Sequence, residues 1–154
     1  MFAVLDKYQQ DAYRNLLTIA QRFQGAFLCD GVGLGKTFVG LMLLERMVVH
    51  AGQRVVLFAP KAACEDVWKP AIERYLPHLN SRFVNLVLFN HTDLQRKNTF
   101  QRELELTLHD ADVVIIDEAH HFRNPGVKGE GIKEPSRYRK LQTLLQTSRR
   151  PKAL

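Results

Sequence analysis

The sequence CDGVGLGKT occupies residues 29–37 and has the pattern of a loop that binds phosphate. Its last three residues, Gly35, Lys36 and Thr37, match the end of the formula G-x-x-x-x-G-K-[S/T]. In such loops backbone N–H groups surround the phosphates, the lysine contacts the β- and γ-phosphates, and the hydroxyl binds magnesium. One position departs from the formula, because Asp30 stands where glycine is usual. The stretch therefore predicts a nucleotide site with an unexplained acid at its entrance.

The alternative is a glycine-rich turn that holds no ligand. By composition alone, the pattern G-x-G-K-[S/T] would arise in about one of two hundred chains of this length. The apolar runs on both sides lower that chance, because a helix beginning at Lys36 would aim its N-terminus at an anion. Glycine also adopts the left-handed backbone that a phosphate nest needs. We expect the following loop residues to bind ATP: Gly33, Leu34, Gly35, Lys36 and Thr37.

Short apolar runs alternate with longer amphipathic segments, which is typical of an α/β domain with a mainly parallel sheet. Two of the runs lack the alternation of a strand with one wet face, so helices should cover both faces of the sheet. The predicted strands are 26–29, 54–59, 82–89 and 112–117. The predicted helices are 7–23, 36–50, 64–75, 93–108 and 137–146. In the second helix, Gly40 would allow close approach to a neighbouring element.

Length and composition exclude several classes of protein. A chain of 154 residues suits one well-buried domain, and 45% hydrophobic with 25% charged residues is typical of a globular protein. Its apolar stretches fall far short of the roughly 20 residues that cross a bilayer, and the N-terminus lacks a secretion leader, which favours the cytoplasm. Cys29 and Cys64 have neither metal-ligand nor disulfide spacing and are expected to be structural thiols. The net charge of +6 favours a polyanionic partner such as nucleic acid.

The sequence VVIIDEAHH, residues 113–121, is an apolar strand that ends in carboxylates and histidines. Ligands of α/β folds bind at the carboxyl edge of the sheet, where such a strand ends. Asp117 can hold Mg²⁺ opposite the Thr37 hydroxyl, and Glu118 can orient or deprotonate a water that attacks the γ-phosphate. His120 has no partners for a metal site and is otherwise a hydrogen-bonded loop histidine. The two halves of one magnesium–nucleotide site agree.

Together these motifs resemble the N-terminal RecA-like motor domain of superfamily-two helicases, and most closely the Swi/Snf-related DNA translocases. In that group the phosphate loop reads D-E-M-G-L-G-K-T, so the resemblance accounts for Asp30, while Gly31 in place of glutamate is a departure. The sequence DEAHHFRN, residues 117–124, is similar to the family's D-E-A-H followed by K-N, with Arg123 and Asn124 in the last two places.

The resemblance implies roles for individual residues. It assigns Asp117 to magnesium, Glu118 to water activation, and His120 to coupling the nucleotide state to a second motor domain. The sequence KYQQDA resembles the glutamine motif that reads the adenine edge, which makes Gln9 the candidate, with Tyr8 packed nearby. An ordinary amphipathic helix start is the alternative for this segment.

Two further segments resemble motifs that contact the nucleic-acid backbone. The sequence LFAPKAACEDVWKPAIERY is similar to the family's V-P-x-x-L-x-x-W-x-x-E segment, so Lys61 and the N–H groups after it could hold a phosphate. Trp68, amid apolar positions of a helix, is expected to be a core anchor rather than a base-stacking platform. Thr92 in FNHTDLQR could contact a phosphate, although helix capping explains it as well.

The resemblance extends from about residue 5 to residue 154 and implies one N-terminal, ATP-binding, RecA-like domain over 1–154. The family's S/T-A-T motif and second RecA-like domain, which supplies an arginine finger, would follow, so we expect the chain to be a truncated fragment with almost no hydrolysis of its own. ATP and Mg²⁺ are the implied cofactors, double-stranded DNA is the favoured partner, and the cytoplasm or nucleoid is the implied location. The alternatives are an RNA helicase, the motor subunit of a restriction system, a P-loop kinase, and a non-catalytic nucleotide-dependent binding module.

Overall fold

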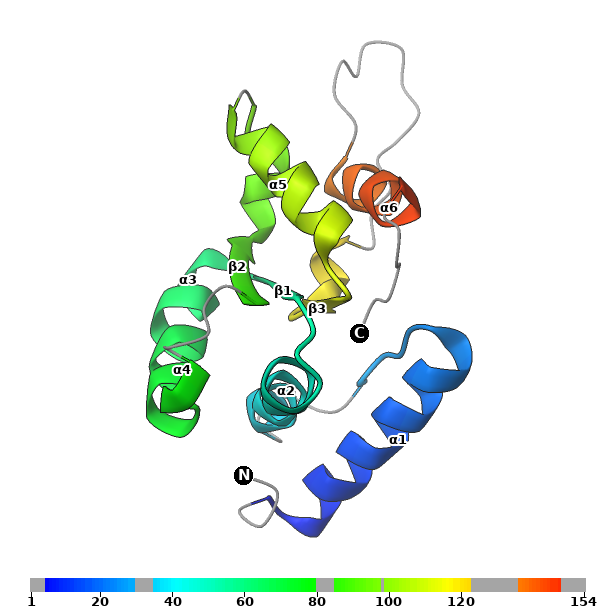
Figure 1. The fold of residues 1–154 in the computed structure, drawn as a ribbon, viewed down its shortest axis with the longest axis vertical. Coiled ribbons are helices and arrows are strands. Elements are labelled where there is room, and N and C mark those ends of the chain that lie inside the picture. Colours follow the sequence, from blue (N-terminus) through cyan, green and yellow to red (C-terminus); the bar gives the residue numbers. More distant parts are fainter. Residues whose placement is uncertain (1–4, 30–34, 80–84, 98, 123–135, 148–154) are drawn as a thin grey trace.

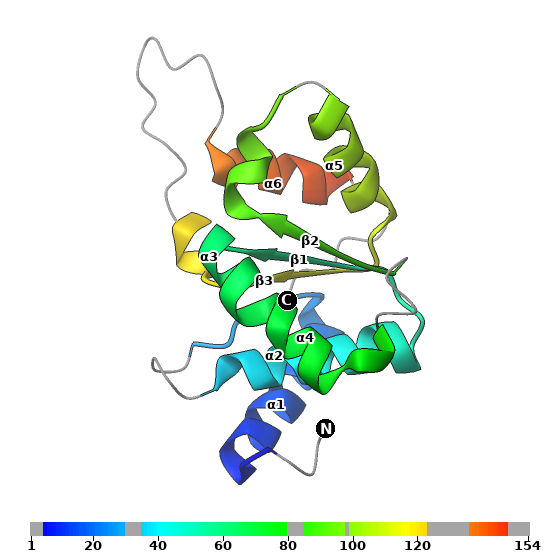
Figure 2. The same ribbon diagram turned by 90° about the vertical axis from the view of Figure 1, so that its left-hand side faces the viewer.

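The chain forms a three-layer α/β structure around a parallel sheet (Figure 1). The computed structural model describes residues 5–29, 35–79, 85–97, 99–122 and 136–147. Three strands pair in the order β2-β1-β3. Their bounds are β1 Val55–Ala59, β2 Leu86–Asn90 and β3 Val113–Ile116. Figure 2 shows α1, α2, α3 and α4 on one face of the sheet and α5 and α6 on the other. The prediction of a mainly parallel sheet with helices on both faces is confirmed.

The sheet separates two hydrophobic cores, because successive side chains of a strand point to opposite faces. In β1, Val55 and Leu57 belong to the core under α1, α2 and α4. Val56 and Phe58 belong to the core under α5 and α6. Every residue of β1 is buried, which explains why its sequence shows no polar alternation.

The register of the sheet brings the carboxyl ends of all three strands to one edge. Ala59 pairs with Asn90 of β2, and Phe58 pairs with Ile116 of β3. The residues that follow these strands are therefore neighbours in space although they are far apart in the sequence. This edge is where ligands bind in parallel α/β sheets.

The helices of the first face begin with α1, Lys7–Phe23, which has the predicted bounds. The second helix is α2, Lys36–Leu44, and it continues as a π-helical segment, Glu45–His50. The predicted helix 64–75 begins earlier than expected, because Pro60 takes the N-cap position and its carbonyl accepts from the Cys64 N–H at 2.9 Å. Its parts are α3 Lys61–Ala63, the π-helical segment Cys64–Trp68 and α4 Lys69–Tyr75, and a separate 3₁₀ turn, Pro77–Leu79, follows.

The predicted helix 93–108 is wrong at its start. A 3₁₀ turn, His91–Gln95, comes first, the chain is extended at Arg96 with ψ 151°, and α5 then runs over Thr99–Asp110. The Asp93 carboxylate accepts from the Asn90 N–H at 2.7 Å and closes the short turn. The last helix, α6 Arg137–Thr147, is one residue longer than predicted.

The predicted strand 26–29 does not form. Ala26 and Leu28 pack against the core, but Phe27 is 83% exposed and only Gly25 makes an isolated bridge. The described strands pair only with one another, in the order β2-β1-β3, and none of them pairs with residues 26–29. Apolar composition alone does not make a strand without a neighbour to pair with. The predicted strand 82–89 is confirmed only from Leu86, since 82–84 lie outside the described residues.

No helix in the described part of the chain is long and apolar enough to cross a membrane. Both cysteines are free thiols. Cys64 is buried and its Sγ lies 3.8 Å from the carbonyl oxygens of Ala59 and Phe89, as expected for a structural thiol. Cys29 is exposed, so the same expectation is wrong for it.

Candidate nucleotide and metal site

Helix α2 begins where the phosphate-loop pattern ends. Gly35 is its N-cap with φ 73° and ψ 32°, the left-handed conformation that favours glycine, and its carbonyl accepts from the Phe38 N–H at 2.9 Å. Lys36 and Thr37 form the first turn and are half-buried. The other predicted loop residues, Gly33 and Leu34, lie outside the described residues together with Asp30 and Gly31.

The structure brings Gln9 of α1 against this helix start. A Cβ placed on Gly35 would collide with the Gln9 Nε2 atom, so glycine at position 35 leaves room for the glutamine side chain. The Gln9 Oε1 atom accepts from the Asp6 N–H at 3.2 Å, which fixes that side chain across the first turn of α1. Tyr8, beside it in the sequence, is 44% exposed. Two segments predicted to bind one nucleotide are thus neighbours in space.

The chain turns sharply just after β3. The Asp117 N–H still donates to the Phe58 carbonyl at 2.8 Å, which extends the pairing with β1 by one residue. Glu118 then has φ 53°, a left-handed conformation that is uncommon for residues other than glycine. A 3₁₀ turn, Ala119–Phe122, follows. Such backbone strain of about 1–3 kcal/mol is concentrated at functional sites.

The Asp117 carboxylate is held by the side chain of Trp68. The indole Nε1 donates to Asp117 Oδ2 at 2.9 Å, and Trp68 is only 3% exposed. The other oxygen, Oδ1, accepts no hydrogen bond from any residue that the structure describes. The prediction that Trp68 is a core anchor is confirmed, whereas the bond to Asp117 was not predicted. A buried indole N–H needs an acceptor, and that requirement was the available signal.

Gly40 provides the space for this indole. A Cβ placed on Gly40 would lie 2.5 Å from Trp68 Cη2 and 3.2 Å from Cζ3. The expected close neighbour of Gly40 is therefore the six-membered ring of Trp68. Because Gly40 lies three residues after Thr37 on the same helix, one indole connects the first turns of α2 with the carboxylate at the end of β3.

Two contacts that involve histidine side chains lie beyond Asp117. His120 Nδ1 is 3.0 Å from Glu118 Oε2, with both side chains about half exposed. His91, at the end of β2, is buried, and its Nδ1 is 3.3 Å from Nδ1 of His121. Burial, together with the neighbouring His121, holds the pKa of His91 below its ordinary value. The contact between His91 and His121 was not predicted, because it depends on β2 and β3 ending at the same edge.

The candidates for nucleic-acid contact also lie at this edge. Lys61 begins α3 directly after β1 and is exposed. Thr92 lies in the 3₁₀ turn after β2 and is exposed as well. The alternative that Thr92 caps a helix is wrong, because Asn90 holds the N-cap position of that turn. The two residues thus share one edge of the sheet.

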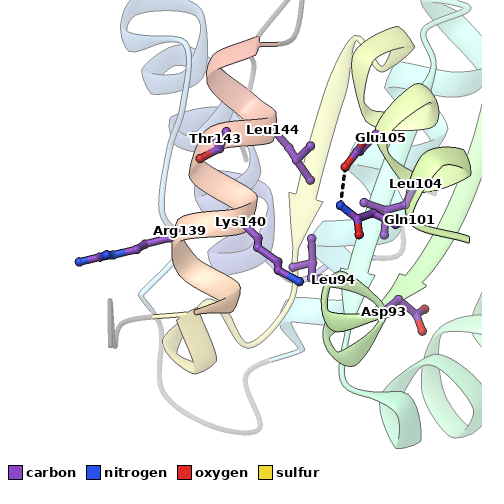
Figure 3. A pocket seen from close by; sticks show the side chains of 9 residues that line it. All are labelled: Asp93, Leu94, Gln101, Leu104, Glu105, Arg139, Lys140, Thr143 and Leu144. Atoms are coloured by element: carbon purple, nitrogen blue, oxygen red, sulfur yellow. Dashed lines mark hydrogen bonds between the residues drawn. The ribbon is translucent and has the colours of Figure 1, made fainter. Parts of the chain in front are cut away.

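A hollow of about 200 Å³ lies on the opposite face of the sheet, between α5, α6 and the turn His91–Gln95 (Figure 3). Gln101 and Glu105 face each other across one turn of α5 at its wall, with Gln101 Nε2 donating to Glu105 Oε1 at 2.8 Å (Figure 3). None of the residues predicted for the nucleotide site lines this hollow. It is therefore separate from the site at the start of α2.

Comparison with known proteins agrees with this geometry. The model of the family described as "Type III restriction enzyme, res subunit" matches residues 3–150. An uncharacterized ATP-dependent helicase of Bacillus subtilis, YqhH, is 29% identical over 118 residues, which cover 71% of this chain and 21% of that protein. The putative ATP-dependent RNA helicase QP509L of African swine fever virus is 25% identical over 134 residues, which cover 79% of this chain and 25% of that protein.

The chain thus spans a quarter or less of the length of these relatives. The family match extends over nearly all of its 154 residues. The chain belongs to the family described as the res subunit of type III restriction enzymes, and its fold is that of a superfamily-two helicase-type motor domain.

Proposed function

We propose that this chain is the ATP-binding, N-terminal RecA-like half of a DNA translocase that is related to the Swi/Snf group. One observation carries the proposal: a single indole contacts both helix α2, at Gly40, and the Asp117 carboxylate after β3. The bond from Trp68 satisfies a buried indole N–H and also fixes the Asp117 carboxylate at the carboxyl edge of the sheet. This supports a nucleotide site, because such a site needs a carboxylate fixed opposite a phosphate loop.

Nucleotide binding is assigned to the start of α2 and the first turn of α1. Lys36 would contact the β- and γ-phosphates, and the backbone N–H groups from Gly33 to Thr37 would surround them. Gln9 would read the adenine edge with Tyr8 beside it. The contact between Gln9 and Gly35 supports this part, because the adenine reader and the phosphate loop must approach the same nucleotide from adjacent elements.

The donor set fits magnesium. In the described part of the chain, no three histidine, cysteine or acidic side chains gather as a metal cage. Mg²⁺ does not need one, since it is usually held by one or two protein oxygens together with phosphates and water. Asp117 Oδ1 and the Thr37 hydroxyl are the oxygens that would hold it. When bound, the cation would neutralise the charge that develops on the phosphates.

Glu118 is assigned to the attacking water. Its left-handed backbone turns the chain away from the strand directly after Asp117, so the two neighbouring carboxylates can serve different tasks. Glu118 would orient the water or take its proton, while His120, 3.0 Å from Glu118 Oε2, would couple that carboxylate to the second motor domain. In an intact motor, ATP would close the two RecA-like domains and hydrolysis would reopen them, so that the pair steps along nucleic acid.

Double-stranded DNA is the proposed track, with Lys61 and Thr92 at its backbone. The family match favours this choice, because it names the res subunit of restriction enzymes. RNA is the second candidate, favoured by the printed description of the African swine fever virus relative. The proposed location is the cytoplasm or the nucleoid, where such a track is found.

The test compares ATP hydrolysis by the intact motor, with both RecA-like domains, on duplex DNA, single-stranded DNA and RNA of one length. Duplex DNA is expected to give the strongest stimulation, and strongest stimulation by RNA would overturn the choice of DNA. The 154-residue chain alone is expected to bind ATP weakly and hydrolyse almost none, because an arginine finger supplied in trans contributes ~10³ to 10⁵ in rate. Strong DNA-stimulated hydrolysis by the isolated chain would contradict that assignment.

A further inference from the structure

The side chain of Trp68 contacts both halves of the proposed site at once. The rim of its six-membered ring fills the space above Gly40 of α2, with Cη2 2.5 Å from where a Cβ would stand. Its pyrrole N–H donates to Asp117 Oδ2 at 2.9 Å on the opposite side. The indole is therefore a rigid spacer between the helix that carries Thr37 and the carboxylate at the end of β3.

Burial prevents this spacer from moving. Trp68 is 3% exposed and ends the π-helical segment Cys64–Trp68, which packs directly onto β2 and continues into α4. An indole has two side-chain torsions and one donor, so fixing the ring fixes the direction of its N–H. Losing that donor would free the Asp117 carboxylate to rotate, because no other described residue holds Oδ2.

We propose that Trp68 is a positioning residue for the nucleotide-bound cation. Its hydrogen bond occupies Oδ2 of Asp117 and leaves Oδ1 for the cation, so that the cation meets one carboxylate oxygen in a fixed place. The proposal rests on the proposed function, because the cation arrives with ATP. Hydrogen-bond partners of metal ligands typically contribute about 10- to 100-fold to metal affinity.

The chain contains one tryptophan, so a single indole N–H resonance reports this contact in a ¹⁵N-labelled sample. The first measurement titrates the 154-residue chain with the non-hydrolysable analogue AMP-PNP, first with EDTA and then with Mg²⁺ or Mn²⁺. Paramagnetic Mn²⁺ is expected to broaden the indole resonance beyond detection, because a cation on Asp117 lies next to the indole N–H. Asp117→Asn is expected to remove that broadening.

The second measurement uses Trp68→Phe, which keeps an aromatic ring and removes the N–H. The Mg²⁺ concentration needed for half-maximal AMP-PNP binding is expected to rise about tenfold, while binding in EDTA stays unchanged. Ile72→Val is the control, since Ile72 lies one turn further along, is equally buried, and loses volume without losing a hydrogen bond. Its Mg²⁺ requirement is expected to equal that of the wild type.

The possible outcomes distinguish a failure of the proposed nucleotide binding from a failure of the role of Trp68. If AMP-PNP perturbs no resonance of the wild-type chain, the proposed function is wrong and the role of Trp68 is wrong with it. If AMP-PNP binds but the indole resonance stays sharp with Mn²⁺, only the role of Trp68 is overturned. An unchanged Mg²⁺ requirement in folded Trp68→Phe would also overturn only the role of Trp68. Where Trp68→Phe does not fold, the Mn²⁺ measurement on wild-type protein can still overturn the role of Trp68.

Discussion

Trp68 and Asp117, 49 residues apart in the sequence, are joined by a hydrogen bond of 2.9 Å from the indole Nε1 to the carboxylate Oδ2. This bond connects the helical segment after β1 with the end of β3. Helix α2 contacts the same indole through Gly40. The spacing between helix α2 and the carboxylate at the end of β3 therefore depends on one aromatic side chain.

Gly40→Ala tests that spacing. Alanine favours a helix by up to about 1 kcal/mol over glycine, but here its Cβ would run into a ring that is buried and cannot withdraw. Overpacking of this kind costs about 1–3 kcal/mol, so the clash should prevail and the free energy of unfolding should fall. Urea denaturation measures the change.

The matched control places Gly40→Ala in a Trp68→Phe background. Phenylalanine removes the outer ring atoms that meet the new methyl group, so alanine should then be neutral or stabilising. The two substitutions should therefore show a coupling free energy. If Gly40→Ala changes the free energy of unfolding equally in both backgrounds, Gly40 and Trp68 are not in contact.

Gly35→Ala tests the start of α2. Gly35 has φ 73°, and its missing Cβ makes room for Gln9 Nε2. Strain at such a backbone position costs about 1–3 kcal/mol, and displacement of Gln9 should add to it. We expect a lower thermal midpoint and weaker binding of AMP-PNP.

Gly52→Ala separates strain from contact. Gly52 has φ 64°, but nothing lies within 4 Å of a Cβ placed there. Gly52→Ala should lower the thermal midpoint through backbone strain alone and should leave AMP-PNP binding unchanged. If the two variants lose the same stability and both bind AMP-PNP like wild type, the contact between Gly35 and Gln9 has no role.

His91 makes stability depend on pH. Burial and the neighbouring His121 depress the pKa of His91 from its ordinary value of 6.5, so the unfolded chain binds a proton there more readily than the folded chain. The free energy of unfolding should therefore be highest above pH 6.5 and fall as the pH drops through that value. Thermal midpoints between about pH 7.5 and pH 5.5 measure this dependence.

His91→Gln should flatten that pH dependence, because the titrating group is gone. His50→Gln is the control, since His50 is exposed and its loss should leave the dependence unchanged. An equally steep loss of stability in His91→Gln would assign the effect to other groups.

The fold followed from sequence where periodicity and burial agree. Strand β1 lies within the predicted 54–59, and α1 has the predicted bounds. The run 26–29 has similar composition, yet no described strand pairs with it, and composition does not reveal which runs find a partner. Strand propensity is a property of one segment, whereas pairing in a sheet requires a second segment beside it.

The individual residues of the candidate site could be predicted from the sequence, but the contacts between them could not. Lys36, Thr37, Asp117 and Glu118 stand out by residue type at positions where strands end and helices begin. The contact of Gln9 with Gly35 and that of His91 with His121 depend on how α1 and β2 lie against the rest, which a linear pattern does not contain. The hydrogen bond from Trp68 to Asp117 likewise depends on how two elements that are distant in the sequence pack together.

The two cysteines should react at different rates. Cys29 is exposed, whereas Cys64 is 3% exposed and burial raises the pKa of its thiol, which lowers the thiolate fraction. Titration with a thiol reagent in native buffer should label Cys29 rapidly and Cys64 only after unfolding. Cys29→Ser should abolish the fast phase, and a fast phase that persists in this variant would contradict the burial of Cys64.

The start of α2 is the proposed binding site for the phosphates of ATP. Calorimetric titration of the 154-residue chain with Mg²⁺·ATP, in wild type and Lys36→Ala, tests it most directly. Lys69→Ala is the control, because Lys69 is an exposed lysine paired with Glu65 at 2.7 Å on a different helix. Wild type and Lys69→Ala are expected to bind Mg²⁺·ATP and Lys36→Ala is not; equal affinity in Lys36→Ala and wild type would show that the start of α2 does not hold the phosphates.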